Sequence, residues 1–189
     1  MTMCGYEFTC IPSAAEEDEA VSDPAELVKR LSLKKAEAVF RSLPEERRRE
    51  AVIVGSDTVV VLDGEIIGKP KDPDDAFRML RRESGRANTV YTGLAVVRTS
   101  EESPDVMESS VVCDEARVRF AELTDEEIAA YIATGDPLDK AGAYGIQGCF
   151  SMFIEGIEGS YFTVVGLPVH ILYRELRRFG AVPKGIVLS

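Results

Sequence analysis

The stretch VIVGSDTVVVL, residues 52–62, decides how the rest of the sequence is interpreted. It is apolar at both ends, which predicts a single buried β-strand. Ser56, Asp57 and Thr58 interrupt this strand, and a charge buried without partners costs several kcal/mol or more. The strand therefore either uses Asp57 to bond backbone amides at a bulge, or carries this carboxylate to a cleft where a metal or cations hold its charge.

A glycine within the strand and a Gly-Lys-Pro sequence just after it favour the second alternative, in which Asp57 faces a ligand-binding cleft. Gly55 removes a side chain next to the acid, as a closely approaching ligand would require. The sequence LDGE at residues 62–65 predicts a turn into a short returning strand. Gly68-Lys69-Pro70 closes this hairpin with a lysine that can face the same region. A Gly-Lys-Pro sequence alone is a weak signal, so its weight comes from these neighbours.

The composition indicates a globular protein, and we expect residues 1–189 to form one domain. Apolar residues make up 45% and charged residues 29% of the chain. The net charge of −11 disfavours binding to nucleic acid or to an anionic membrane, but it allows a small anion held by local lysines. The start has no positive segment, and no run reaches the roughly 18 apolar residues of a membrane helix, which predicts a cytoplasmic location.

The cysteines and the histidine give little support to nucleophilic or zinc chemistry. No Cys-x-x-Cys sequence occurs, which indicates scattered reduced thiols; the cysteines are Cys4, Cys10, Cys113 and Cys149. The single histidine, His170, lies among Val169, Ile171 and Leu172, a pattern typical of a helix face. A Ser-His or Cys-His mechanism would need this one residue and is therefore disfavoured.

Helices and strands alternate along the chain. Helix-start patterns occur at Asp23-Pro24, Asp72-Pro73, Thr124 and Pro168, and the charged run 44–50 predicts a solvated helix or loop. Further strands are expected at 90–97, 111–120, 150–157 and 161–165. Because the hairpins are antiparallel, we expect an α/β fold in which helices flank a mixed sheet.

Two other segments carry polar groups with open roles. Lys35 follows Leu31 and precedes Val39 at helical spacing, so this lysine either snorkels outward, as the helix alone favours, or faces a polar cleft. Residues 134–148, TGDPLDKAGAYGIQG, are rich in glycine and charge. This loop either packs only against its neighbours or presents groups such as Gln147 to a ligand.

Carboxylates with lysines, in the absence of a catalytic histidine pattern, suggest Mg²⁺-assisted chemistry on a phosphate ester. Mg²⁺ takes one or two carboxylates together with phosphate oxygens, and a carboxylate can activate a water molecule. No Walker A sequence occurs, so a P-loop nucleotidase is not expected.

Four long motifs together resemble the Maf family of nucleoside triphosphate pyrophosphatases. They are GSDTVVVLDGEIIGKPKD at 55–72, SGRANTVYTGLAVV at 84–97, YIATGDPLDKAGAYGIQG at 131–148 and IEGSYFTVVGLP at 157–168. The resemblance extends from about residue 4 to about residue 179. It implies a two-lobed domain similar to inosine triphosphatases, with a nucleotide cleft, a possible homodimer and a divalent cation, Mg²⁺ or Mn²⁺. It also implies conversion of a nucleoside triphosphate to the monophosphate and pyrophosphate.

The resemblance assigns roles to particular residues. The family's catalytic acid matches Asp57, which would also hold the metal. Its helix lysine matches Lys35, which reverses the preference for snorkelling, and its Gly-Lys-Pro lysine matches Lys69; the resemblance implies that both lysines bind the substrate. The early acid that would complete the metal site matches Glu17, with Glu16 as the rival position in the same acidic run.

The substrate branch is implied by two further positions. Thr58 and Gln147 are similar to the dTTP/UTP branch of the family rather than the branch associated with 7-methyl-GTP. A Gln amide offers both a donor and an acceptor, as the edge of a pyrimidine ring requires. The alternatives are a non-catalytic nucleotide-binding or regulatory protein linked to septum formation, and a related enzyme that removes purine triphosphates.

The sequence departs from the family at its start. The family opens with a β-strand and a Ser-x-Ser-Pro-Arg-Arg loop, whereas here the Gly-x-x-Phe sequence already occupies residues 5–8. The missing arginines would each remove about 1.5–3 kcal/mol of charge-assisted bonding. We therefore expect that the true start lies upstream or that this copy is damaged, with impaired activity as written.

Overall fold

The computed structural model describes residues 1, 4–15, 21–100 and 106–184. The chain forms two compact units, in agreement with the expected two lobes. The first comprises Met1–Asp57, Gly93–Cys113 and Leu167–Ser189, and the second comprises Thr58–Thr92 and Asp114–Gly166. The prediction that residues 1–189 form a single domain stays a prediction.

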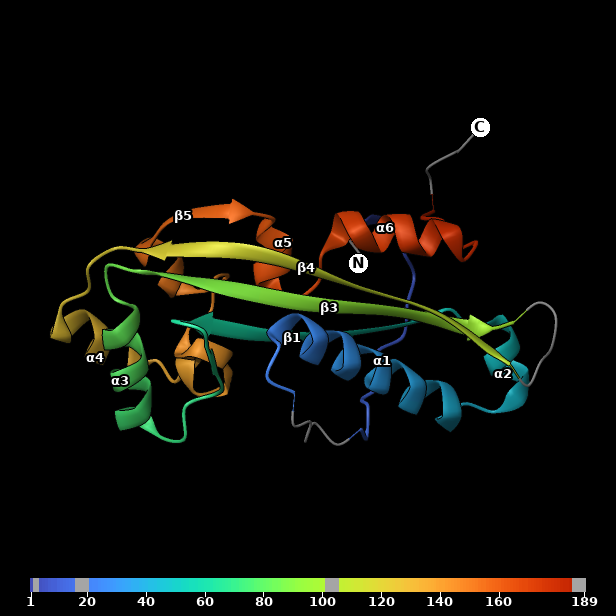
Figure 1. Cartoon of the computed structure of the whole chain (residues 1–189), viewed down its shortest axis with the longest axis horizontal. Helices are drawn as coiled ribbons and strands as arrows, with labels where there is room; N and C mark the ends of the chain where they lie inside the picture. The colour runs from blue at the N-terminus through green and yellow to red at the C-terminus, as the bar shows by residue number, and fades with distance from the viewer. Residues whose placement is uncertain (2–3, 16–20, 101–105, 185–189) are drawn as a thin grey trace. The chain divides into compact units, whose positions relative to one another are not determined.

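Within the described residues, five strands form one sheet in the order β2-β1-β3-β4-β5 (Figure 1). Their bounds are Ile53–Leu62 for β1, Glu65–Ile67 for β2, Ala87–Thr99 for β3, Met107–Phe120 for β4 and Ile154–Gly159 for β5. Strand β1 pairs with β2, and β4 with β5, in antiparallel register. The arrow of β3 runs opposite to those of β1 and β4 in Figure 1.

The α/β class is therefore confirmed, but the sheet is antiparallel rather than mixed. Helix α3 (Pro73–Glu83) connects β2 to β3, and these two strands run in the same direction. In many proteins a connecting helix of this kind joins neighbouring parallel strands. Because β1 lies between β2 and β3 in the sheet, the two strands that share a direction are not neighbours.

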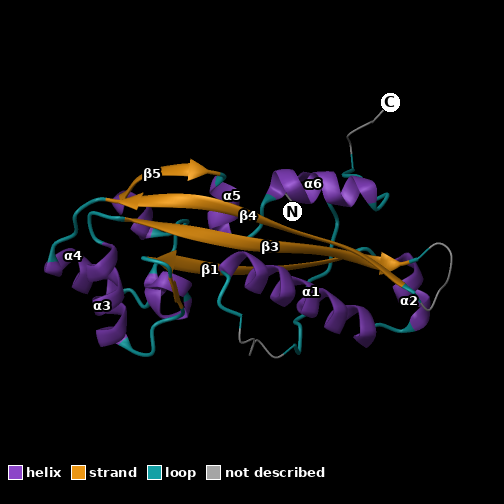
Figure 2. Cartoon of the chain, viewed as in Figure 1, coloured by secondary structure: helices purple, strands orange, loops and turns teal. Residues whose placement is uncertain are grey.

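The described helices, purple in Figure 2, begin largely where the sequence predicts. Besides α3 they are α1 (Pro24–Ser42), α2 (Glu45–Glu50), α4 (Asp125–Ala133), α5 (Tyr161–Val165) and α6 (Val169–Arg178). Asp23 caps α1, Asp72 caps α3, and Thr124 forms a capping box with Glu127 at the start of α4. Each cap satisfies backbone N–H groups that a helix start leaves without intrahelical partners.

Two expected strands near the C-terminus are wrong or shortened. Residues 161–165 form helix α5, and a 3₁₀ turn at Cys149–Phe153 replaces the first part of the strand expected at 150–157. Gly159 and Gly166 flank α5 with φ angles of +108° and +100°. These left-handed residues turn the backbone at each end, so the β-branched content of the segment does not decide its conformation.

In the first unit, α1 and α6 pack on opposite faces of β3. Ala95 and Val97 cluster with residues of α1, whereas Leu94 and Val96 cluster with residues of α6. All four side chains are completely buried. Successive residues of a strand point to opposite faces, which explains why β3 is apolar at every position here rather than at alternate ones.

Helix α1 approaches the sheet so closely that its backbone contacts two glycines. A Cβ atom added at Gly93 would lie 2.1 Å from the carbonyl oxygen of Val28, and one at Gly55 would lie 2.3 Å from that of Ser32. Both distances are far below a van der Waals contact, so these positions of β3 and β1 admit only glycine unless the helix moves.

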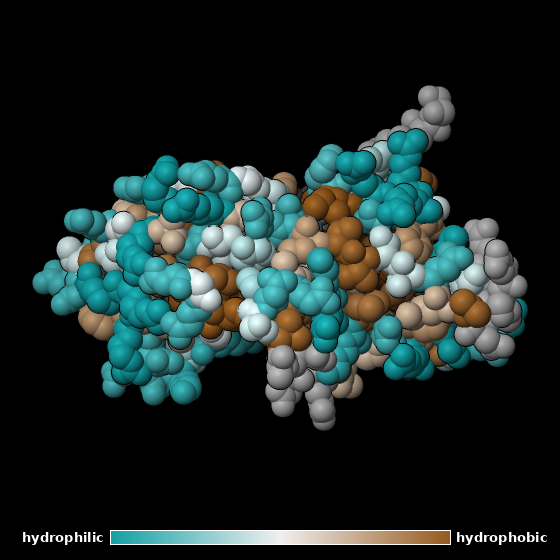
Figure 3. All heavy atoms as spheres, in the orientation of Figure 1, coloured by the Kyte–Doolittle hydropathy of each residue, from teal (hydrophilic) through white to brown (hydrophobic). Residues whose placement is uncertain are grey.

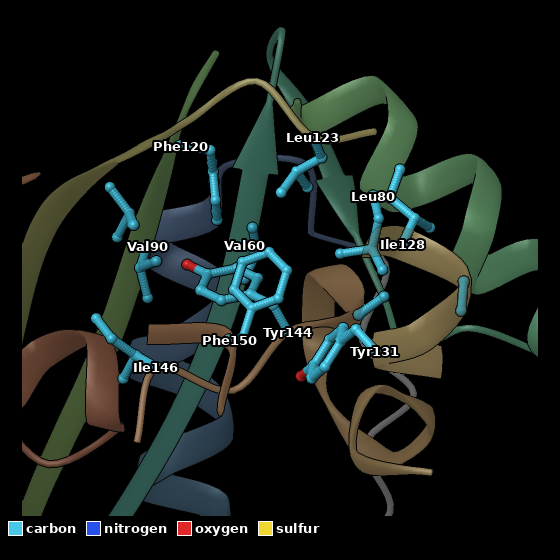
Figure 4. Packing of buried hydrophobic residues seen from close by; sticks show 13 residues of the cluster. Val60, Leu80, Val90, Phe120, Leu123, Ile128, Tyr131, Tyr144, Ile146 and Phe150 are labelled. Atoms are coloured by element: carbon cyan, nitrogen blue, oxygen red, sulfur yellow. The ribbon is translucent and has the colours of Figure 1, made fainter. Parts of the chain in front are cut away.

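The second unit has an aromatic core (Figure 4). The ring centroids of Phe120 and Tyr144 are 4.9 Å apart, and those of Phe120 and Phe150 are 5.7 Å apart, both edge to face. Leu80 from α3 and Ile128 from α4 complete this cluster. The visible outer surface of α3 and α4 is mainly hydrophilic in Figure 3. In the part of the chain that the structure describes, no helix combines the length and apolarity needed to cross a membrane.

The glycine contact of α1 predicts a large loss of stability for Gly55→Ala. The added methyl group meets the backbone of α1 rather than a flexible side chain, so we expect a loss of about 3 kcal/mol or more in the free energy of unfolding. Urea unfolding followed by circular dichroism measures this change. The matched control is Gly68→Ala, where nothing lies within 4 Å of the added atom; equal losses in the two variants would contradict the proposed packing constraint.

Candidate active site

Asp57 and Lys35, two of the predicted site residues, form an ion pair in the first unit. The Nζ atom of Lys35 donates to Oδ1 of Asp57 at 2.5 Å. The side chain of Asp57 is 10% exposed and that of Lys35 is 25% exposed. The lysine therefore faces a carboxylate rather than snorkelling outward, and the charge of Asp57 within its apolar strand has a cationic partner.

The prediction that Gly55 makes room for a ligand is wrong. The sequence suggested that the missing side chain admits a ligand, but the backbone of α1 occupies this space. Ile53, Gly55 and Asp57 alternate along β1, and Ile53 packs with α1 residues. Alternate residues of a strand share a face, so Gly55 and Asp57 both face α1. The close approach of α1 to β1, which requires glycine at position 55, therefore also brings Lys35 to Asp57.

Three other predicted residues line one cavity in the second unit. Thr58, Lys69 and Gln147 surround a space of about 520 Å³, together with groups from the glycine-rich loop. Ligand sites typically measure roughly 300–1,000 Å³, so this cavity can hold a small molecule. The N–H group of Gly142 donates to the carbonyl oxygen of Gly68 at 3.1 Å, which ties the loop to the hairpin that carries Lys69.

The glycine-rich loop folds around Asp136. The hydroxyl of Tyr131 donates to Oδ2 of Asp136 at 2.6 Å, and Lys140 lies 3.2 Å from Oδ1. Cβ atoms added at Gly145 and Gly148 would lie 3.1 and 3.2 Å from Oδ2. The loop therefore both packs tightly and lines the cavity, so the two roles left open by its sequence are compatible.

A buried polar chain behind the cavity was not predicted from the sequence. The completely buried Glu83 accepts a bond of 2.8 Å from Nδ2 of Asn88, and the hydroxyl of Tyr144, which lines the cavity, donates to Oδ1 of Asn88 at 3.4 Å. The other carboxyl oxygen of Glu83 has no hydrogen-bond partner among the residues that the structure describes. Burial raises the pKa of Glu83 to about 8, and the bond from Asn88 opposes this shift only in part. Its position in the helix end RRES carried no signal of this environment.

Of the two predicted metal ligands, Asp57 and Glu17, the structure describes only Asp57. Glu17, and its rival Glu16, lie outside the described residues. Among the described residues, no three His, Cys, Asp or Glu side chains come together as a metal-binding group. The carboxylate of Asp57 has the oxygen-donor chemistry that Mg²⁺ and Mn²⁺ accept, so it fits a divalent cation as one ligand.

Comparison with known proteins decides the family. The sequence profile of a family described as "Maf-like protein" matches residues 1–179.

The chain belongs to the Maf family.

Maf relatives named dTTP/UTP pyrophosphatase are similar over nearly the whole chain. The relative from Dictyoglomus turgidum is 47% identical over 178 residues, covering 93% of this chain and 87% of its own. The relative from Carboxydothermus hydrogenoformans is 46% identical, with 92% and 88% covered, and that from Thermotoga maritima is 46% identical, with 95% and 83% covered. The resemblance inferred from the four motifs is therefore confirmed.

The raised pKa of Glu83 predicts a pH dependence of stability in this Maf protein. Between the ordinary value of 4.5 and the folded value of about 8, the folded state holds a proton that the unfolded state has lost. The stabilisation is fully present below pH 4.5 and is lost as the pH rises to about 8. Glu83→Gln removes this titration, so its unfolding free energy should fall less than that of the wild type across this range.

Chemical unfolding at a series of pH values measures the difference. Glu126→Gln is the matched control, because the same exchange at an exposed position of α4 should leave the wild-type profile unchanged. Parallel profiles for the wild type and Glu83→Gln would show that Glu83 does not hold a proton in the folded state.

Proposed function

We propose that this Maf protein hydrolyses dTTP and UTP to the monophosphates and pyrophosphate. The observation that carries the proposal is the similarity to relatives with that named activity over more than nine-tenths of the chain. The gathering of Thr58, Lys69 and Gln147 around one cavity supports it independently. We extend the proposal to a cytoplasmic location and to a nucleotide rather than a nucleic acid as partner. The net charge of −11 supports the choice of a nucleotide over a nucleic acid.

The reaction breaks the bridge between the α- and β-phosphorus atoms by the addition of water. In our proposal, Asp57 takes the proton of the attacking water, as a positioned carboxylate can. Lys35 holds the carboxylate in place through its bond of 2.5 Å. Lys69 offers an ammonium group to a phosphate, and Gln147 offers an amide to the base.

A divalent cation is part of the proposal, with Asp57 as one ligand and Glu17 as a second. When bound, such a cation would neutralise phosphate charge and polarise a phosphoryl oxygen. The protein's own contribution is to pair the Asp57 carboxylate with the ammonium group of Lys35. A homodimer, which the family resemblance implies, is also proposed.

The role of Asp57 predicts that Asp57→Asn removes most activity and preserves the fold. Asparagine keeps the size of the side chain but cannot take a proton, so kcat should fall by roughly 10²–10⁴-fold. Pyrophosphate release measures activity, and near-UV circular dichroism checks the fold. Glu37→Gln is the control, because it removes another carboxylate paired across α1, 2.8 Å from Arg41. Normal turnover by Asp57→Asn would end the catalytic assignment, and loss of its fold would support a structural role.

The proposed substrate class predicts that kcat/KM for UTP and dTTP exceeds that for ITP and 7-methyl-GTP. Pyrophosphate release measured across the common nucleoside triphosphates tests this order. A preference for ITP would instead favour the purine-removing enzyme. Nucleotide binding without turnover of any triphosphate would favour the non-catalytic regulatory protein.

A further inference from the structure

A chain of three threonines runs inward from the cavity of the second unit. The Oγ1 atoms of Thr58 and Thr92 are 2.9 Å apart, and the hydroxyl of Thr92 lies 2.7 Å from the carbonyl oxygen of Thr163. Thr92 and Thr163 are completely buried, whereas Thr58 lines the cavity. Thr58 and Thr92 belong to the neighbouring strands β1 and β3, and Thr163 belongs to α5.

The hydrogen atoms in this chain can point in only one direction. A carbonyl oxygen only accepts, so the single hydrogen of the Thr92 hydroxyl goes to Thr163. Oγ1 of Thr92 can then only accept from Thr58. The hydrogen of the Thr58 hydroxyl is therefore used within the protein, and Oγ1 of Thr58 has only lone pairs to offer to a ligand.

Gly166 leaves the Thr58 oxygen uncovered on one side. A Cβ atom added at Gly166, whose φ is +100°, would lie 3.2 Å from Oγ1 of Thr58. A side chain at this position would crowd the oxygen. The backbone at the end of α5 thus comes close to Thr58 without placing a side chain against its oxygen.

We propose that Thr92 is a positioning residue that fixes Thr58 as a hydrogen-bond acceptor and so selects bases with a ring N3–H group. This inference rests on the proposed function and deepens it. Uracil and thymine carry a hydrogen at N3, whereas N3 of cytosine is an acceptor that would meet the lone pairs of Thr58. A site that pairs a buried polar group with one base leaves that group unpaired, or opposed, with the other.

Gln147 cannot make this distinction alone. Its amide has a donor and an acceptor end, and the side chain is exposed, so a half-turn presents either end to the base. Thr58 has no such freedom while Thr92 holds its hydrogen. In this proposal, discrimination between uracil and cytosine therefore depends on Thr58, held by the buried Thr92, and not on Gln147.

The test compares kcat/KM for UTP and CTP in the full chain and in variants. The wild type should prefer UTP by roughly tenfold or more, the scale of one neutral hydrogen bond replaced by a mismatch. Thr92→Val removes the acceptor for the Thr58 hydrogen, so the ratio should fall toward one. Thr92→Ser keeps the hydroxyl and should keep the preference.

Thr163→Val is the matched control. The Thr163 side chain bonds Asp114, while its carbonyl oxygen is what orients Thr92. This variant also loses a buried hydroxyl through a Thr-to-Val exchange, but it leaves the direction of the hydrogen bonds from Thr58 to Thr92 to the Thr163 carbonyl unchanged. Its ratio of kcat/KM for UTP to that for CTP should therefore match the wild type. An unchanged ratio in Thr92→Val, or an equal change in Thr163→Val, would overturn the proposal.

Binding measurements distinguish a failure of this proposal from a failure of the proposed function. If the wild type turns over no pyrimidine triphosphate, the proposed function fails, and calorimetry with UMP and CMP still measures the base preference. The wild type alone provides a further check if Thr92→Val does not fold. It should bind 3-methyl-UMP, which lacks the N3 hydrogen, roughly tenfold or more weakly than UMP; equal binding would overturn the role of Thr58 as a fixed acceptor.

Discussion

Helix α1 reaches strands β1 and β3 with its own backbone, because Gly55 and Gly93 place no side chain between them. This contact fixes the depth at which Lys35 leaves the helix. Alternate residues of a strand are about 6.6 Å apart, which is within the reach of a lysine side chain, so Asp57 lies within range of a lysine anchored beside Gly55. A bulkier residue at 55 would move the helix outward and leave the carboxylate of β1 without this cation. The ion pair of the candidate active site thus depends on the close packing of two backbones.

In the second unit, hydrogen bonds of fixed direction hold the polar side chains in place. Tyr131 holds Asp136 inside the glycine-rich loop, and Thr92 holds the hydroxyl of Thr58. Tyr131 and Thr92 are buried and have set partners, whereas Lys69 and Gln147 at the same cavity are exposed. Inner groups of this kind can tell one hydrogen-bonding pattern from another, because they cannot rearrange to suit a mismatched ligand. Exposed groups supply charge and adaptable contacts instead.

Local signals in the sequence predicted local structure well. The caps at Asp23, Asp72 and Thr124 act within one helical turn, so the residues themselves determine where those helices begin. Features that depend on distant partners were missed or misjudged. The segment 161–165 has strand-like residues but forms a helix between two left-handed glycines, and the direction of β3 follows from the position of β1 between it and β2. The candidate site residues were proposed from motifs. Thr92 had no sequence signal because its acceptor, Thr163, lies far along the chain, and Glu83 had none because its burial arises only in the folded unit.

Electrostatics places a further limit on what this acidic Maf protein can bind. Its net charge is −11, and two lysines of the candidate site already lie beside carboxylates: Lys35 beside Asp57, and Lys140 beside Asp136 and Asp139. At physiological salt, charges more than about 8 Å apart are largely screened, and paired charges attract even less at a distance. An anionic ligand that enters the cavity of the second unit competes with Asp136 and Asp139 for the ammonium group of Lys140.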